Sequence, residues 1–255
     1  MIIKAEYMVC SRLVRLKRNS TPQGRKLHRY ITVIIMMLPA VMSQLMTAQD
    51  VKINTNMVVE ADGTLRLDND ATVWNDLMVF PDATTKNGSN PPEWGTAFMK
   101  NGGGTSTGVY LWMFAPNQEE ELHFTVQIPH DYKEGSDIFP HVHWTTATGT
   151  PSGSNVVWGL EYTVVAVGGS FPNTVTVSTS TLVPECGTPS GAGQHLISAF
   201  SSVSGAGLGI STILICRLYR AAGDAADTFP NDVGLLGFDI HYEQDTQGSR
   251  NQWTK

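Results

Sequence analysis

Alternation of apolar and polar residues is the dominant pattern along most of this chain. In one run, Leu122, Phe124, Val126 and Ile128 alternate with polar neighbours, as in a half-buried strand. Gly, Pro, Asn and Asp separate each run from the next, and no run shows a convincing helical period. The pattern predicts strands in GVYLWMFA, LHFTVQIP, IFPHVHWTT, NVVWGLEYTVVAV, TVTVSTSTLV, QHLISAF, GISTILICRLYR and VGLLGFDIHYEQ.

Short strands at this spacing predict an all-β fold, a jelly-roll-like antiparallel β-sandwich, which we assign to residues 76–255. Residues 49–75 contain two short alternating runs around Ala61-Asp62-Gly63. This is typical of a β-hairpin with glycine at positive φ, so we expect an N-terminal hairpin arm. The long polar stretch 81–107 is predicted to be a surface or functional loop.

Residues 1–48 have the layout of a basic leader followed by a signal peptide. A stretch rich in Lys and Arg runs into the apolar residues 31–42, and small residues follow. The alternatives are an uncleaved anchor, a buried helix, or a start codon placed too far upstream. The apolar run is short for a transmembrane helix, so no membrane contact is expected of the mature domain.

Charge is distributed unevenly between this leader and the rest of the chain. Of 17 basic residues 8 lie in the first 30 positions, and of 23 acidic residues only Glu6 precedes residue 49. Residues 49–255 therefore hold 9 basic and 22 acidic side chains, a net charge of -13. Such an acidic body is a poor partner for nucleic acid. Cys10, Cys186 and Cys216 lack metal-ligand spacing, and a disulfide between the last two stays open.

The stretch EGSDIFPHVHW carries two histidines, His141 and His143, on one face of a predicted strand. Ile138, Val142 and Trp144 would form the opposite, core face. The last predicted strand repeats the pattern: Leu236, Phe238, Ile240 and Tyr242 form an apolar face, and Asp239, His241 and Glu243 form a polar one. If the two polar faces adjoined, the three histidines and a carboxylate could bind a first-row metal ion.

The cupin family of metal-binding β-barrels gives a sharper test of that idea. Gly135, five residues and then His141-Val142-His143 match the first half of its pattern. The glutamate expected three or four residues later is replaced by Ala147 and Thr148, and the second half is absent. We therefore expect a structural or surface role for the histidines, and we assign no metal, cofactor or catalytic residue. The sequence also lacks the P-loop and the dinucleotide-binding fingerprint.

Carboxylates and loop tryptophans are weaker signals of function. Glu161, Asp239 and Glu243 lie on predicted strands, but nothing selects two of them as a glycosidase pair. The acidic run QEEE at 118–121 is interpreted as a solvated turn, with a calcium site as the alternative. Trp94 and Trp253 could stack on sugar rings or contact a protein partner, or could fold back on the domain.

Several segments resemble a family of uncharacterised structural proteins of tailed bacteriophages. They are ATVWNDLMV, EEELHFTVQIPHDYKEGSDIFPHVHW, NVVWGLEY, HLISAF, ILICRLYR, LLGFDIHYE and DTQGSRNQWTK, within residues 71–255. The resemblance implies a virion component such as a head decoration, fibre or tail-associated protein, without catalytic residues. The leader departs from this expectation, because a signal peptide is not expected on a protein assembled in the host cytoplasm.

Together these features predict a non-enzymatic structural or adhesive protein located in a virion. Its expected partners are other copies of itself and other virion proteins. Loops 81–107 and 184–194 would face a capsid, a tail protein or a cell-surface glycan. The first alternative is a secreted carbohydrate-binding or adhesion module, and the second is a cupin-like metalloenzyme.

Overall fold

Antiparallel strands form nearly all the regular structure in the described part of the chain. A computed structural model describes residues 49–86, 88–95, 108–146, 153–182 and 193–255. The leader, residues 87 and 96–107 of the first long loop, and residues 184–192 of the second, which include Cys186, lie outside the described residues. Two 3-10 turns, η1 (Asn69–Ala71) and η2 (Pro81–Ala83), are the helical elements described. No helix among the described residues is long and apolar enough to cross a membrane.

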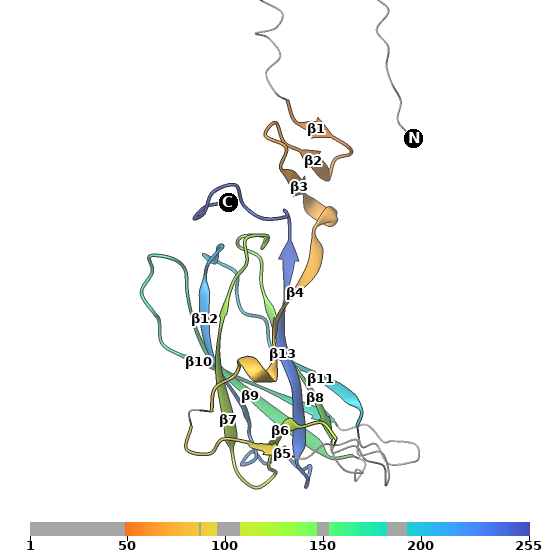
Figure 1. The fold of residues 1–255 in the computed structure, drawn as a ribbon, viewed down its shortest axis with the longest axis vertical. Coiled ribbons are helices and arrows are strands. Elements are labelled where there is room, and N and C mark those ends of the chain that lie inside the picture. Colours follow the sequence, from red (N-terminus) through yellow and green to blue (C-terminus); the bar gives the residue numbers. More distant parts are fainter. Residues whose placement is uncertain (1–48, 87, 96–107, 147–152, 183–192) are drawn as a thin grey trace, which may run out of the picture. The chain divides into compact units, whose positions relative to one another are not determined.

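Two sheets build the sandwich (Figure 1). One has four strands in the order β10 (Val175–Leu182), β9 (Asn155–Val165), β12 (Ile213–Arg220) and β7 (Glu120–Gln127). The other has the order β11 (His195–Ala199), β8 (Phe139–Thr146), β13 (Val233–Gln244), β6 (Leu111–Phe114) and β5 (Glu93–Gly95), with β4 (Val73–Val79) also paired to β13.

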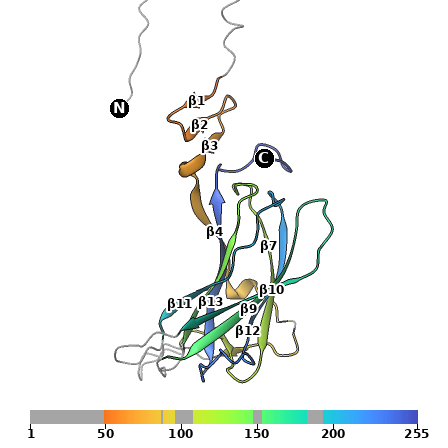
Figure 2. The same ribbon diagram turned by 180° about the vertical axis from the view of Figure 1, so that it is seen from behind.

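The strand order is that of a jelly roll. From β7 to β13 the chain changes sheet at every step except between β9 and β10. Figure 2 shows the same strands from behind. β4 and β6 occupy one position in tandem, because both pair with the same edge of the long strand β13. Each sheet thus has four main positions filled by antiparallel neighbours, and the predicted jelly-roll-like β-sandwich is confirmed.

The core lies between the two sheets and follows the predicted alternation. Val142 and Trp144 of β8 are fully buried, and so are Phe238 and Ile240 of β13. Aromatic rings join the layers: Phe124 of β7 lies 4.8 Å from Phe238, measured between ring centroids. Burying one large apolar side chain contributes about 1.5–3 kcal/mol, so this shared core is what holds the sheets together.

A β-bulge in β13 changes the predicted face of one residue. The register between β13 and β8 shifts between Leu235 and Gly237. Leu235 is buried in the core, whereas Leu236, predicted to share the face of Phe238, is only partly buried and lines a surface pocket. The extra residue of a bulge breaks the two-residue alternation, so the assignment of Leu236 to the core was wrong.

The N-terminal segment contains one strand more than a hairpin. β1 (Val51–Lys52), β2 (Met57–Val59) and β3 (Leu65–Leu67) form a three-stranded antiparallel sheet. Gly63, in the turn between β2 and β3, has a φ of +87°, as predicted. The next strand, β4, begins at Val73 and pairs with β13 over seven residues, so pairing in the sandwich starts three residues before position 76.

Two charged residues are buried where the sequence pattern did not predict it. Glu120, expected in a solvated turn, begins β7 and is 5% exposed, because its carboxylate accepts hydrogen bonds from the Ala115 backbone and the Gln118 amide. Arg220, at the end of β12, is fully buried beside Asp227. A calcium site at 118–121 is disfavoured as well, since Glu119 and Glu121 both pair with Arg217.

Candidate functional site

The site lies on the face of the six-stranded sheet that points away from the sandwich core. His141 and His143 project from β8 on this face, opposite Val142 and Trp144. In the antiparallel register His141 is paired with Asp239 of β13, and His143 is paired with Gly237. Asp239 is therefore within reach of both imidazoles. We call His141, His143 and Asp239 the His–Asp cluster.

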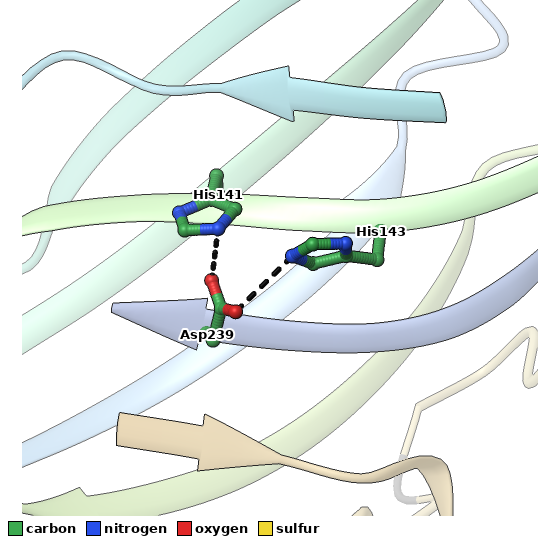
Figure 3. Close-up of side chains that lie close together, drawn as sticks. All are labelled: His141, His143 and Asp239. Atoms are coloured by element: carbon green, nitrogen blue, oxygen red, sulfur yellow. Dashed lines mark hydrogen bonds and ion pairs between the residues drawn. The ribbon is translucent and has the colours of Figure 1, made fainter. Parts of the chain in front are cut away.

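Both imidazoles point at the same carboxylate (Figure 3). His141 Nε2 contacts Asp239 Oδ1, and His143 Nε2 lies 3.1 Å from Asp239 Oδ2. The two rings are 4.9 Å apart between centroids. One carboxylate thus links two neighbouring histidines, with one oxygen for each.

The second ring nitrogen, Nδ1, of each imidazole also has a partner. His141 Nδ1 lies 3.3 Å from the backbone carbonyl oxygen of Phe139. His143 Nδ1 lies 2.6 Å from Nε2 of His195, a residue of β11. Sequence reasoning missed His195. The available signal was its position at the start of a predicted strand, which gives no indication that β11 lies beside β8.

Burial and charge shift the pKa values of the cluster in different directions. Burial alone would lower the pKa of His141, but the hydrogen bond and negative charge of Asp239 raise it above the ordinary value. Burial lowers the pKa of His143 and its two histidine neighbours lower it further, which together outweigh the opposing effect of Asp239. Burial opposes the charged form of Asp239, yet the hydrogen bond from His141 and the nearby imidazoles keep its pKa below the ordinary value. At neutral pH these directions favour an ionised Asp239 beside a neutral His143.

His241 and Asp76 adjoin the cluster. His241 Nε2 lies 3.1 Å from Asp76 Oδ1 on β4, and the rings of His141 and His241 are 4.1 Å apart between centroids. These two side chains are about half exposed, unlike the cluster itself. The structure therefore brings together the three histidines and the carboxylate that the sequence suggested as a conditional metal site.

A small pocket opens beside the cluster, at the bulge in β13. Its volume is about 220 Å³. His143, His195 and Asp239 line its polar side, and Met78, Phe80 and Leu236 line its apolar side. The site therefore combines nitrogen and oxygen donors with an apolar wall, as ligand sites commonly do.

Large apolar side chains surround the cluster on the same sheet face. They are exposed by 38–60%, and we call them the apolar rim: Trp74, Met78, Phe80, Phe139 and Ile197. The rings of Trp74 and Phe139 pack edge to face at 5.4 Å between centroids. Exposed apolar groups gathered on one face mark a contact surface more often than scattered ones do.

The remaining candidates do not join this site. Glu161 lies on β9 in the other sheet, where its carboxylate is 3.3 Å from Arg217, so it forms no pair with Asp239. Trp94 packs edge to face on Trp112, 4.7 Å away between centroids. Trp253 is largely exposed near the C-terminus.

Comparisons with known proteins add little to this picture. No protein-family model matches the chain, and no curated protein matches it. Among solved structures, the carbohydrate-binding module TmCBM61 in complex with β-1,4-galactotriose is 15% identical, over 68% of this chain and 88% of that one, with a TM-score of 0.25. A likeness of that size supports neither a fold nor a function, so the fold assignment rests on the strand order.

Proposed function

We propose that this chain is a non-enzymatic structural protein of a bacteriophage particle, and that its copies associate through the apolar rim. The observation that carries the association is the exposure of Trp74, Met78, Phe80, Phe139 and Ile197 on one sheet face. The phage assignment is supported by the sequence resemblance. A jelly-roll body joined to an N-terminal arm suits a building block of an assembly.

Charge favours this face over the rest of the surface for self-association. With a net charge of -13 over residues 49–255, two copies repel each other at long range. On the rim face, the carboxylates of Asp239 and Asp76 are each paired with histidine. Contact here would bury apolar area without bringing unpaired carboxylates together, and burial of apolar area yields about 25 cal/mol per Å².

The test is the molar mass of the protein in solution, by light scattering over a range of concentrations. We expect wild type to form a homo-oligomer, and a Trp74→Ser/Phe80→Ser variant to dissociate because two rim side chains are lost. The matched control is Val167→Ser/Phe171→Ser, which changes two similarly exposed apolar residues in the β9–β10 loop. A monomeric wild type, or an oligomer that the rim variant leaves intact, would contradict the proposal. The phage assignment further predicts neighbouring capsid or tail genes.

Sugar binding at the same face is the second candidate. Trp74 exposes most of its indole, and His241 and Asp76 provide polar groups from the adjoining strands. An exposed aromatic ring beside hydrogen-bonding groups is the arrangement that stacks on and orients a sugar ring. Screening the protein on a glycan array, with Trp74→Ala as the comparison, would separate this function from self-association. Binding that survives Trp74→Ala would exclude this face as the sugar site.

A further inference from the structure

We propose that His141, His143 and Asp239 bind one divalent first-row transition-metal ion, with an open coordination position facing the pocket. This inference does not depend on self-association or on a phage origin. It concerns the two imidazoles and one carboxylate of the His–Asp cluster, whose ligand atoms all lie within 4.8 Å of one another. Zinc is the reference ion, because imidazole and carboxylate are among its usual ligands.

The spacing of the ligand atoms is close to what a metal ion requires. Zinc lies about 2.0–2.2 Å from nitrogen and oxygen ligands, so tetrahedral ligand atoms are roughly 3.3 Å apart. His143 Nε2 and Asp239 Oδ2 are already 3.1 Å apart. His141 Nε2 contacts the other oxygen of the same carboxylate and would have to move away slightly. Small side-chain rotations within the fixed register of β8 and β13 would complete the site.

The orientation of His141 is the strongest evidence. Its Nδ1 faces the Phe139 carbonyl oxygen at 3.3 Å, and because a carbonyl only accepts, this contact is a hydrogen bond when the proton is on Nδ1. In the neutral ring Nε2 is then a lone pair, and it faces a carboxylate oxygen. In this tautomer the two lone pairs repel each other unless a cation lies between them, and either a second proton on His141 or a metal ion would supply it.

The outer contact of His141 matches that of a metal ligand, and His143 has a histidine nitrogen in the corresponding place. Ligating histidines usually donate their other ring N–H to a carbonyl, carboxylate or water, which fixes the ring and raises its basicity. With the proton on Nδ1 of each ring, the acceptor would be the Phe139 carbonyl for His141 and, for His143, the Nε2 of His195, which lies 2.6 Å from His143 Nδ1. In this tautomer both Nε2 lone pairs converge on the space beside Asp239. His195 would act as a positioning residue.

Burial favours this trio over the neighbouring one. Asp76, Asp239 and His241 also group together, but His241 and Asp76 are about half exposed. The side chains of His141, His143 and Asp239 are 5%, 21% and 10% exposed, so water competes less for the ion. The pocket of about 220 Å³ at His143 and Asp239 leaves room for water or a ligand donor at a fourth position.

Metal titration of the full-length protein tests the site. The protein is stripped with EDTA, dialysed and titrated with Zn²⁺ by calorimetry, and separately with Co²⁺, followed by its visible absorption. We expect one equivalent to bind at the cluster. His143→Ala and Asp239→Asn should each weaken the affinity at least 10-fold. His195→Ala should weaken it by about 10-fold to 100-fold, the usual effect of losing an outer partner.

Matched controls separate this site from others. His130→Ala and His123→Ala remove histidines outside the cluster and should leave the affinity unchanged, with circular dichroism verifying the fold of every variant. Less than about a tenth of an equivalent bound by wild type would overturn the proposal. So would affinity unchanged in both His143→Ala and Asp239→Asn. A loss confined to His241→Ala would move the ion to the exposed trio and overturn this assignment. If Asp239→Asn fails to fold, the Co²⁺ spectrum of His143→Ala against wild type decides.

Discussion

Replacing Arg220 with methionine should strongly destabilise the fold. The guanidinium is fully buried and uses its donors on Asp227 and three backbone carbonyl groups. Nε and one terminal nitrogen donate to the two Asp227 oxygens at 3.0 and 2.7 Å, while the remaining bonds reach the carbonyl oxygens of Phe114, Phe229 and Asn231. This one side chain therefore fixes residues 221–232 against the end of β12 and β6.

The expected loss of stability in Arg220→Met follows from the groups that the substitution leaves without partners. Methionine fills similar space but leaves the Asp227 side chain, 1% exposed, without its positive partner. Removing one partner of a buried ion pair costs about 3–5 kcal/mol. Arg220→Lys keeps the charge but has its three donors on a single nitrogen, so it cannot reproduce the two parallel hydrogen bonds of the guanidinium with Asp227. We expect it to lower the unfolding free energy by about 2 kcal/mol.

Urea unfolding of wild type and variants, followed by tryptophan fluorescence, measures the change. The double variant Arg220→Met/Asp227→Ala should lose less than the sum of its single changes, because the orphaned carboxylate is then gone. A loss below about 1 kcal/mol for Arg220→Met would refute the reasoning, since it would mean that Asp227 is not an uncompensated buried charge. Domains are typically stable by only about 5–15 kcal/mol, so Arg220→Met could leave no folded protein to unfold. In that case the unfolding free energy of Arg220→Lys is measured instead.

Three further outcomes are expected. Gly159→Ala should cost about 1–3 kcal/mol in thermal or urea unfolding, because the added Cβ would overlap the Tyr219 ring. The hydrogen bond from Lys133 lowers the pKa of Glu243 below its ordinary 4.5, so its stabilising effect is present above that pH and lost as pH falls. The difference in unfolding free energy between wild type and Glu243→Gln should therefore shrink on acidification. Burial raises the pKa of the Cys216 thiol to about 12, so a thiol reagent at pH 8 should label it only after unfolding.

Each of these outcomes has a control. Gly223→Ala places a Cβ where no atom lies within 4 Å, so it should be close to neutral; an equal loss at Gly159 and Gly223 would exclude the ring overlap as the cause. A Glu243→Gln difference that grows on acidification would reverse the inferred sign. Labelling of Cys216 is followed in a Cys10→Ser/Cys186→Ser variant, and rapid labelling of the folded protein would contradict its burial.

The sequence alone was sufficient for the fold class and for the faces of most strands. A strand buried on one side must place apolar residues at every second position, so Val142, Trp144, Phe238 and Ile240 were assigned to the core from their spacing. Turn residues marked where strands end, and Gly63 adopts the positive φ that its turn requires. These features are local, and local patterns can be read without knowing which strands are neighbours.

The tertiary structure decided which strands meet and where alternation fails. The bulge in β13 places Leu236 at the pocket, and the residue pattern did not predict the bulge. Arg220 and Glu120 are buried because distant backbone groups and Asp227 satisfy them, which only the packed chain provides.

The His–Asp cluster shows most clearly which features the sequence determines and which depend on the tertiary structure. The sequence identified His141, His143 and Asp239 as polar positions on two strands, but it could not show that those strands are neighbours. Pairing of β8 with β13, nearly a hundred residues apart in the chain, brings Asp239 opposite His141 and within 3.1 Å of His143. Pairing of β11 with β8 adds His195. Strand neighbours are chosen by the packing of the whole core, so the site exists only once the sheet has formed.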